Sequence, residues 1–515
     1  MTDGRPARGR RGGRAARTGD GHAQVGQRPF AQPVRRWEPI RGVSDDELEA
    51  IHQASLQVLR DVGMDVLSPE ARSVLAGHGA RVDAERVRFD PDLVVELISH
   101  APATFTLHTR NPDHALSFGD GKVAFSAVAS APNVSGLGAE RHPGTVDDFT
   151  RLVCLTQSLH SLHLHGGYPV EPIDWHPSVR HLHATDVLLR CSDKALHSYS
   201  LGRQRTLDTI EMVRIARGIS EERLMDEPSI YTVVNTSSPL RLDAPMAEGI
   251  LELSARNQAV VVTPFTLAGA MAPVTVAGAL VQQNAEALAG IALTQAVRPG
   301  APVVYGGFTS NVDMQSGAPA FGTPEFVNAA LIGGQLARRY ALPYRSSGVN
   351  AANALDTQST SESMFSLWGA VLGGADLVVH AAGWMEGGLR ASYEKMVLDA
   401  EVLEKLALAL TPITVDDASL AVEAIAEVGP GGHFFGVAHT RERYRDAFHQ
   451  PMLSDWRNYE TWDEAGRPTA DQRAAEIANE LLAHHVDPPM DAAASAELTE
   501  FVERRVADGG VATAF

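Results

Sequence analysis

The chain has 515 residues, a formal net charge of −19, 44% hydrophobic residues and 21% charged residues. This length allows two or three domains, or one large barrel with additions, and it can bury a sizeable core. The negative charge argues against nucleic acid as a partner of the folded part. No apolar run approaches the roughly 20 residues that span a bilayer, so no membrane partner is expected.

Residues 1–36 differ from the rest of the chain. They contain the Arg- and Gly-rich stretch RPARGRRGGRAARTGD and show no apolar periodicity, which predicts a disordered tail. Contact with nucleic acid or a protein partner is the functional alternative. No hydrophobic segment follows the arginines, so the stretch is not typical of a secretory signal. Cys154 and Cys191 form no CxxC motif, which favours a reducing, cytoplasmic location.

The next segment, residues 37–119, is predicted to mix helices with short strands. Asp45, Asp46 and Glu47 precede a helical apolar pattern and are typical of an acidic first turn.

From about residue 120 to residue 400, apolar runs alternate with helical segments such as Thr206–Ile219 and Pro245–Arg256. Eight such units are the number that closes a barrel of parallel strands. A doubly wound sheet would usually carry a glycine phosphate loop, and neither GxGxxG nor GxxxxGK[ST] occurs. The sequence therefore predicts an α/β fold, a TIM (β/α)8 barrel over residues 120–400. The predicted strands are Val123–Ser126, Leu162–His165, Leu196–Leu201, Ile230–Val234, Val260–Pro264, Val303–Gly307, Tyr344–Ser347 and Leu377–Ala381.

In the middle of this region, the loops that follow strands are longer than the turns that follow helices. Long loops of small residues follow the strands, whereas only Ala301 separates Arg298-Pro299-Gly300 from the next apolar run. Pro273 is predicted to open one helix, and Thr323 and Pro324 to cap and begin another. In such barrels the functional site lies on the face with the strand-to-helix loops. Beyond residue 400, residues 401–515 are predicted to form a C-terminal helical extension.

Twenty histidines suggest a metal site as one possibility. His163 and His165 alternate in LHLHGG, so on a strand they share one side. His197 ends the next predicted strand, and Asp313 and His380 could complete a ligand set. A metal-dependent hydrolase is therefore one hypothesis; hydrogen-bonded histidines around a polar barrel mouth are the alternative.

Aromatic residues in the predicted long loops suggest a cationic ligand. A quaternary ammonium group has no N–H to donate, so aromatic faces and a nearby carboxylate are its strong partners. Aromatic residues that simply cover the barrel core are the alternative. Asp313 is a better site candidate than Glu325 or Glu286, which suit helix positions. The aromatic residues are Tyr168, Trp175, Phe265, Tyr305, Phe308 and Trp384.

Long ordered blocks of sequence resemble the trimethylamine methyltransferase family of corrinoid methyltransferases. The resemblance extends from about residue 36 to the C-terminus. Its blocks are SPLRLDAPM (238–246), TPFTLAGAMAPVT (263–275), QQNAEALAG (282–290), GAPVVYGGF (300–308), DMQSGAPAFGTPE (313–325), HAAGWMEGGL (380–389), SYEKMVLDAE (392–401) and GPGGHFFGVAHT (429–440).

The resemblance implies a TIM barrel that moves a methyl group from a methylated amine to the Co(I) of a corrinoid protein. The corrinoid (cobalamin) belongs to that partner, so no tightly bound cofactor and no metal are expected here. We also expect a homo-oligomer. On this interpretation His380 and Asp313 are the candidate catalytic residues. The candidate substrate-binding residues are Tyr168, Trp175, Phe265, Phe308, Trp384, Glu386 and Arg345.

The founding members of the family use pyrrolysine, whereas this sequence has only standard residues. The expected position lies in PYRSSGVNAANALDTQ (343–358), with Gly348 as the best match. Relatives without pyrrolysine act on quaternary amines such as glycine betaine, and the resemblance implies such a substrate here. A non-catalytic protein that binds quaternary amines remains a third hypothesis.

Overall fold

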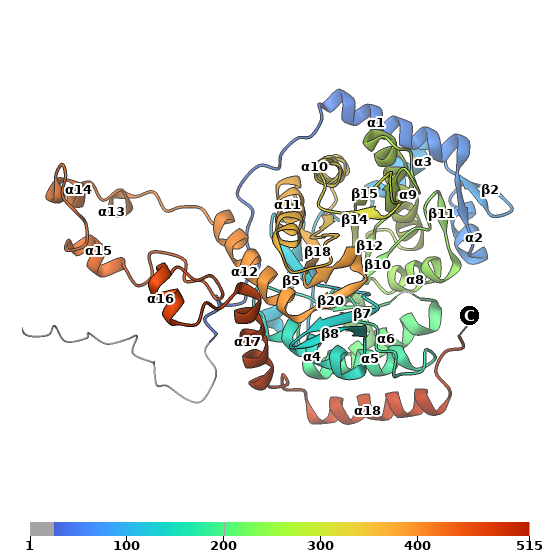
Figure 1. Ribbon diagram of the computed structural model, residues 1–515. Coiled ribbons are helices and arrows are strands. Elements are labelled where there is room, and N and C mark those ends of the chain that lie inside the picture. Colours follow the sequence, from blue (N-terminus) through green and yellow to red (C-terminus); the bar gives the residue numbers. More distant parts are fainter. Residues whose placement is uncertain (1–24, 200, 514–515) are drawn as a thin grey trace, which may run out of the picture.

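The computed structural model describes residues 25–199 and 201–513. Most of the predicted tail, residues 1–24, therefore lies outside the described residues. Figure 1 shows a layer of helices around a central sheet, with one segment extending away from it. In the described ranges, no helix is both long and apolar enough to cross a membrane.

Seven parallel strands form the central sheet, in the order β6-β18-β17-β14-β12-β10-β9. Each one falls on a predicted apolar run, so seven of the predicted strands are confirmed. β9 is shorter than predicted, with two residues. The strands are β6 (Ala124–Ala127), β9 (Leu196–His197), β10 (Ile230–Val234), β12 (Ala259–Val262), β14 (Val303–Gly306), β17 (Tyr344–Ser347) and β18 (Leu377–Ala382).

The remaining predicted strand, residues 162–165, makes isolated parallel bridges instead of a full ladder. Leu164 bridges Ser126 on one side and Ala195 on the other. The amide of His163 donates to Phe125 O at 2.8 Å, and the amide of His165 donates to Ala195 O at 3.0 Å. This segment thus contacts both edges of the seven-stranded sheet.

Side chains of the sheet alternate between two apolar environments, as strand geometry requires. One face carries a separate buried cluster that includes Tyr231, Ala259, Val261, Val304 and Val379. The other face packs against helices that run between the strands. Those helices are α4 (Val146–Ser158), α5 (Arg180–Cys191), α6 (Arg203–Arg217), α8 (Ala244–Ala255), α9 (Val276–Val297), α10 (Pro324–Arg339), α11 (Thr357–Gly373) and α12 (Tyr393–Leu410).

Polar residues next to the helices determine where several of them begin. The side chain of Thr323 caps α10 and Pro324 occupies its first turn, as predicted. Helix α9 begins at Val276 with Thr275 as its cap, three residues beyond the predicted start at Pro273.

The predicted long loops contain small sheets that the sequence did not indicate. β13 (Phe265–Ala268), β15 (Phe308–Val312) and β16 (Pro319–Ala320) form one of them, directly after β12 and β14. A second one contains β19 (Trp384–Met385), β20 (Arg390–Ser392), β7 (Asn133–Gly136) and β8 (Ala139–Pro143). Short strands therefore cover the carboxyl ends of the central strands.

The N-terminal segment packs against this body. Helix α1 (Asp45–Gln57) has the predicted acidic first turn, and Ser44 and Glu47 form a capping box. A hairpin of β4 (Phe105–Leu107) and β5 (Leu116–Phe118) adds Leu107, Leu116 and Phe118 to the cluster on the inner face of the sheet. The N-terminal segment also contains β1 (Met64–Val66), α2 (Pro69–Gly77), β2 (Arg81–Asp83), β3 (Arg86–Arg88) and α3 (Pro91–Ser99). Two short elements, α7 (Glu221–Asp226) and β11 (Arg241–Leu242), lie in the region of the central strands.

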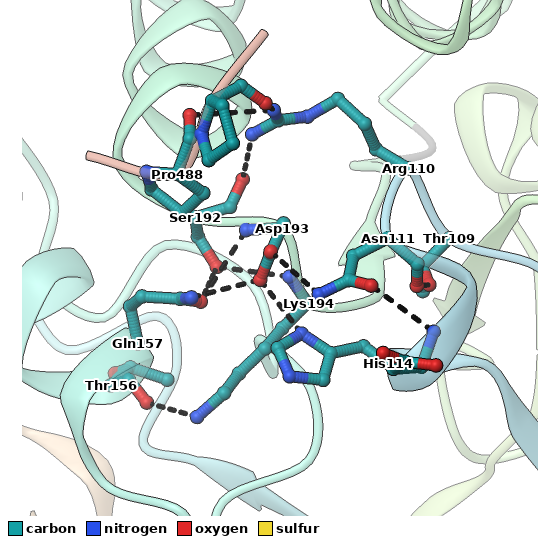
Figure 2. A network of polar contacts seen from close by, with 12 residues as sticks. Thr109, Arg110, Asn111, His114, Thr156, Gln157, Ser192, Asp193, Lys194 and Pro488 are labelled. Atoms are coloured by element: carbon teal, nitrogen blue, oxygen red, sulfur yellow. Dashed lines mark hydrogen bonds and ion pairs between the residues drawn. The ribbon is translucent and has the colours of Figure 1, made fainter. Parts of the chain in front are cut away.

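A network of polar side chains lies at the amino end of β9 (Figure 2). Asp193, just before β9, accepts hydrogen bonds from Asn111 at 3.0 Å and Gln157 at 2.8 Å, and lies 2.7 Å from His114 Nδ1. Lys194 points the other way and donates to the carbonyl oxygens of Thr156 and Leu159. These contacts join the N-terminal segment to the ends of α4 and α5.

The C-terminal residues are helical, and they divide into two parts. Helices α17 (Ala470–Ala483) and α18 (Ala492–Ala507) pack on the body. Between α12 and α17, residues 411–469 extend away from the body, and we call this segment the arm (Figure 1). The arm contains α13 (Asp417–Leu420), α14 (Val422–Val428), α15 (Ala438–Arg443) and α16 (Tyr459–Glu464).

Candidate functional site at the carboxyl ends of the strands

Buried polar atoms without partners gather at the carboxyl ends of the central strands. Native proteins satisfy nearly all such atoms, so a group of unsatisfied ones points to a bound ligand or water. Within the described residues, the atoms are His197 Nδ1, Thr263 Oγ1, Arg345 Nε, Ser347 Oγ, His380 Nδ1 and Trp384 Nε1.

Arg345 is the charged group of this site. Its position on β17 pairs with Leu377, so its side chain lies on the inner face of the sheet. Only 2% of it is exposed. Burial lowers the pKa of Arg345 to about 10, and it still carries a charge at neutral pH. The guanidinium lies 5.2 Å from the Phe308 ring and donates to Gly307 O at 3.3 Å, but among the described residues it forms no ion pair with a carboxylate. A buried cation without a counter-ion is costly, so Arg345 favours an anionic group in the site.

His380 owes its orientation to a break in the β18 ladder. The pairing of β18 with β6 shifts register between Val378 and Ala382, and His380 has a φ of +58°. This left-handed conformation is rare outside glycine and often marks functional sites. Burial, followed by the nearby Arg345 and His197, lowers the pKa of His380 well below its usual value. The imidazole is therefore neutral at physiological pH.

Aromatic rings surround His380. The Trp384 ring lies 4.1 Å from the His380 ring between centroids, and the Phe308 ring lies 6.0 Å away. Phe265 stacks on Phe308 at 5.1 Å, and Phe321 lies between Phe308 and Trp384 at 5.7 and 6.5 Å. We call Phe265, Phe308, Phe321, His380 and Trp384 the aromatic group. Its π faces are suited to a quaternary ammonium ion.

The structure thus brings together five predicted site residues, namely Phe265, Phe308, Trp384, His380 and Arg345. It adds two that the sequence analysis did not assign to the ligand. Phe321 lies in a loop without any marker of function. His197 accepts the amide of Val233 at Nε2, so its proton resides on Nδ1, a buried donor without a partner.

Tyr168 and Trp175 belong to a different group of rings. Tyr168 lies 4.2 Å from Tyr199, whose ring contacts His197 at 5.1 Å. Trp175 packs on Phe149 and His183, and Phe149 in turn contacts Tyr168, so Trp175 is two rings further from His197 than Tyr168 is. Their role in substrate binding stays a prediction.

The two predicted acidic residues have protein partners of their own. Asp313 is exposed and accepts hydrogen bonds from the amides of Gln315 and Ser316, which it caps. Glu386 pairs with Arg141 at 2.9 Å and with Arg390 at 2.8 Å. Both carboxylates are thus engaged by protein groups, and their roles in the site remain predictions.

His163 and His165, the histidine pair of the metal hypothesis, make hydrogen bonds to protein groups. His163 Nδ1 accepts the amide of Phe125 at 3.0 Å, and its Nε2 lies 3.0 Å from Ala31 O. His165 Nε2 lies 2.7 Å from Ser192 Oγ. In the part of the chain that the structure describes, the cluster with metal-ligand spacing is Glu401, Glu404 and His449, at the root of the arm. The geometry therefore favours structural roles for His163 and His165.

The fold defines an α/β protein, and its candidate site lies at the carboxyl ends of parallel strands. Comparison with known proteins identifies its family. Residues 8–510 match the family described as Trimethylamine methyltransferase (MTTB). The chain therefore belongs to the trimethylamine methyltransferase family and is a methyltransferase, which confirms the resemblance.

Individual relatives agree with this assignment. The chain is 33% identical to glycine betaine methyltransferase of Desulfitobacterium hafniense (strain Y51), covering 90% of this chain and 96% of the relative. It is 30% identical to trimethylamine methyltransferase MttB of Desulfitobacterium hafniense (strain DSM 10664 / DCB-2), covering 92% and 95%. The fold is similar to that of the monomethylamine methyltransferase MtmB of Methanosarcina barkeri, with a TM-score of 0.51, 10% identity and coverage of 92% and 90%.

Proposed function

We propose that the protein moves a methyl group from a quaternary amine, glycine betaine or a similar compound, to the Co(I) of a corrinoid protein. The observation that carries this proposal is the buried, unpaired Arg345 next to the aromatic group. A zwitterion with a quaternary nitrogen and a carboxylate complements both features at once. The names of the two Desulfitobacterium relatives, which act on methylated amines, support the proposal.

The carboxylate of such a substrate would pair with Arg345. This pairing supplies the counter-ion that Arg345 lacks, and two further donors are available. Ser347 Oγ and His197 Nδ1 are buried and find no partner among residues 25–199 and 201–513. Charge-assisted hydrogen bonds of this kind are about twice as strong as neutral ones and also fix orientation.

The quaternary nitrogen would then lie against the aromatic group. Because the imidazole of His380 is neutral, it does not repel the cation. The corrinoid of the partner supplies the nucleophile, a Co(I) ion that accepts the methyl group. The C–N bond breaks and its electron pair stays on nitrogen, so the amine leaves neutral and no general acid is needed. This chain therefore has to desolvate the cation and orient one methyl group.

This chemistry suits a chain without pyrrolysine. A quaternary nitrogen is already positively charged and is a better leaving group than a tertiary amine. The expected pyrrolysine position offers no space either, because a Cβ on Gly348 would meet Leu367 Cδ2 at 2.7 Å and Ala381 Cα at 3.1 Å.

The test is a panel of methylated amines with Co(I) cobalamin or a cognate corrinoid protein, followed by the change in cobalt absorbance. We expect methyl transfer from glycine betaine, weaker transfer from choline, which has no carboxylate, and none from trimethylamine. Binding of glycine betaine without transfer to any corrinoid would instead favour the non-catalytic binding protein. Transfer from trimethylamine alone would contradict the proposed substrate.

We further propose that residues 162–165 close the central sheet into an eight-stranded (β/α)8 barrel. The parallel bridges of Leu164 to Ser126 and Ala195 support this closure. Hydrogen exchange tests it, since the amides of His163 and His165 should then exchange as slowly as those of β6 and β10. Exchange as fast as in exposed loops would indicate an open sheet.

We also propose a cytoplasmic homo-oligomer. Free cysteines fit a reducing compartment. The arm exposes large apolar side chains, and a second copy of the chain would cover them. Light scattering should give a mass that is a multiple of the chain mass. The double variant Phe435→Asp with Phe448→Asp should have a lower mass in solution. A monomeric wild type would contradict the proposal. The exposed arm residues are Ile413, Val415, Leu420, Val422, Ile425, Phe434, Phe435, Tyr444, Phe448, Trp456 and Tyr459.

A further inference from the structure

The two cysteines of the sequence lie close together in the structure, although 36 residues separate them. Cys154 is on α4, and Cys191 is the last residue of α5. The two side chains interact with each other, both are only partly buried, and both are free thiols. Neither cysteine is therefore fully enclosed in the core.

A histidine and an aspartate complete the cluster. His485 and Asp487 lie between α17 and α18, and their side chains are 3.1 Å apart. His485 Nδ1 is 3.4 Å from Ser158 Oγ, one helical turn beyond Cys154. The side chain of His485 is only 10% exposed.

The backbone around the cluster is held in place by the network of Figure 2. Arg110 donates to the carbonyl oxygens of Pro488 and Pro489, just after Asp487, and also to those of Leu189 and Ser192, on either side of Cys191. Three elements therefore present the two thiols and the imidazole to one another with little freedom to separate.

The charges of the cluster favour a thiolate on Cys154. Its contact with Cys191 and then its contact with His485 lower the pKa of Cys154, although burial opposes this. The same contact raises the pKa of Cys191, and the contact with Cys154 raises the pKa of His485. Cys154 thus lies between a thiol and an imidazole whose pKa values are both raised, with Asp487 as a further charged group. Reactive cysteines occur in such surroundings.

We propose that Cys154 and Cys191 form a peroxide-reactive dithiol, in which Cys154 attacks the peroxide and Cys191 closes a disulfide between α4 and α5. The Cys154 thiolate attacks one oxygen of hydrogen peroxide and the O–O bond breaks, which gives a sulfenic acid and hydroxide, and the proton that Cys154 released converts this hydroxide to water. The sulfur of Cys191 then attacks the Cys154 sulfur and displaces hydroxide, which takes the Cys191 proton and leaves as water. In total, two thiols are oxidised and one peroxide is reduced to two waters. A partner that holds Co(I) is a strong reductant, so this enzyme works where an oxidant would be harmful.

The experiment starts from the full-length protein, reduced and then freed of thiols, at neutral pH with a small excess of hydrogen peroxide. Free thiols are counted under denaturing conditions, and peptides are mapped by mass spectrometry. We expect both thiols to disappear together and one peptide pair to be linked through Cys154 and Cys191. The Cys191→Ser variant should stop at a sulfenic acid on Cys154, trapped by dimedone. In the Cys154→Ser variant, Cys191 should react at least about 10-fold more slowly.

A matched pair of histidine variants tests the thiolate. His485→Gln should slow the oxidation of Cys154 about 10-fold, because the thiolate loses its cationic partner. His484→Gln is the control, since His484 is exposed and its Nδ1 lies 2.9 Å from the carbonyl oxygen of Glu480, and it should leave the rate unchanged. Thermal unfolding of each variant checks that it is folded.

Three results would overturn the proposal. These are equal oxidation rates for wild type and Cys154→Ser, disulfides that form only between chains, or a sulfinic acid on Cys154 in wild type with Cys191 still reduced. A slow rate in both histidine variants would equally overturn the assigned role of His485.

Discussion

At the amino ends of the parallel strands, the Asp193 carboxylate has three side-chain partners, whereas at the carboxyl ends the buried Arg345 has no carboxylate partner among the described residues. Both ends of the sheet bury polar and charged groups, but within the described residues the amino end satisfies most of them internally, with Arg110 Nε as an exception. A satisfied hydrogen-bond network stabilises the fold, whereas buried donors and acceptors without a protein partner can bind a ligand. Substitutions at the two ends should therefore affect different properties.

Arg345→Gln should have the largest effect on activity. It removes the proposed counter-ion of the substrate carboxylate, and we expect kcat/KM for glycine betaine to fall about 10³-fold. The measurement is methyl transfer to Co(I) cobalamin. For choline, which has no carboxylate, wild type and variant should differ little.

Arg338→Gln is the control for that experiment. Arg338 lies on α10 and donates to Gly373 O, away from the aromatic group. Its loss should leave kcat/KM unchanged within about 2-fold. Equal losses in both variants would show that Arg345 acts through the fold.

Substitutions in the aromatic group should have the next largest effect. Trp384→Ala removes one π face, which is worth about 2 kcal/mol in a desolvated site, so kcat/KM should fall about 30-fold. His380→Asn keeps a residue that tolerates the left-handed backbone and should lower methyl transfer as well. If neither variant changed methyl transfer, the site would be wrongly placed.

At the amino end, Asp193→Ala should lower stability and not chemistry. It leaves Asn111, His114 and Gln157 without their common acceptor, and the free energy of unfolding should fall by about 3 kcal/mol. Denaturant unfolding measures this loss. The kcat of the protein that remains folded should equal that of wild type; a lower kcat would show that the two ends are coupled.

The smallest expected effect is a pH dependence from Lys194. Burial lowers its pKa to about 7, with Asp193 as the opposing charge. The unfolded chain therefore binds more protons between pH 7 and pH 10, so stability should rise with pH over this range. The slope should not exceed about 1.4 kcal/mol per pH unit. Lys194→Met should remove this slope in pH-dependent denaturant unfolding, and an identical slope in both proteins would contradict it.

The sequence predicted the positions of the seven central strands well, because each is an apolar run between turn residues. It missed the small sheets at the carboxyl ends, since strands such as β13 and β19 have only two to four residues and no alternation long enough to read. The start of α10, marked by Thr323 and Pro324, was predicted to the residue, whereas the start of α9 was predicted three residues too early.

The candidate site could be predicted only in part. The aromatic residues and Arg345 were named from their loops and from the family resemblance. The unsatisfied Nε atom of Arg345 could not be predicted from the sequence, because only the folded structure shows that it is buried. The sequence did contain a signal for the turn at Asp313. An aspartate followed by Met-Gln-Ser is typical of a turn in which the aspartate side chain accepts hydrogen bonds from the next backbone amides. The orientation of His380 depends on a register shift that no sequence pattern marks.

The left-handed backbone at His380 also constrains how this position can evolve. Most residues would be strained there, and β-branched ones most of all. A descendant that abandoned the present chemistry could replace His380 most easily by asparagine, aspartate or glycine, which tolerate the same φ. The residue at position 380 would then distinguish homologues that keep the present chemistry from homologues that have lost it.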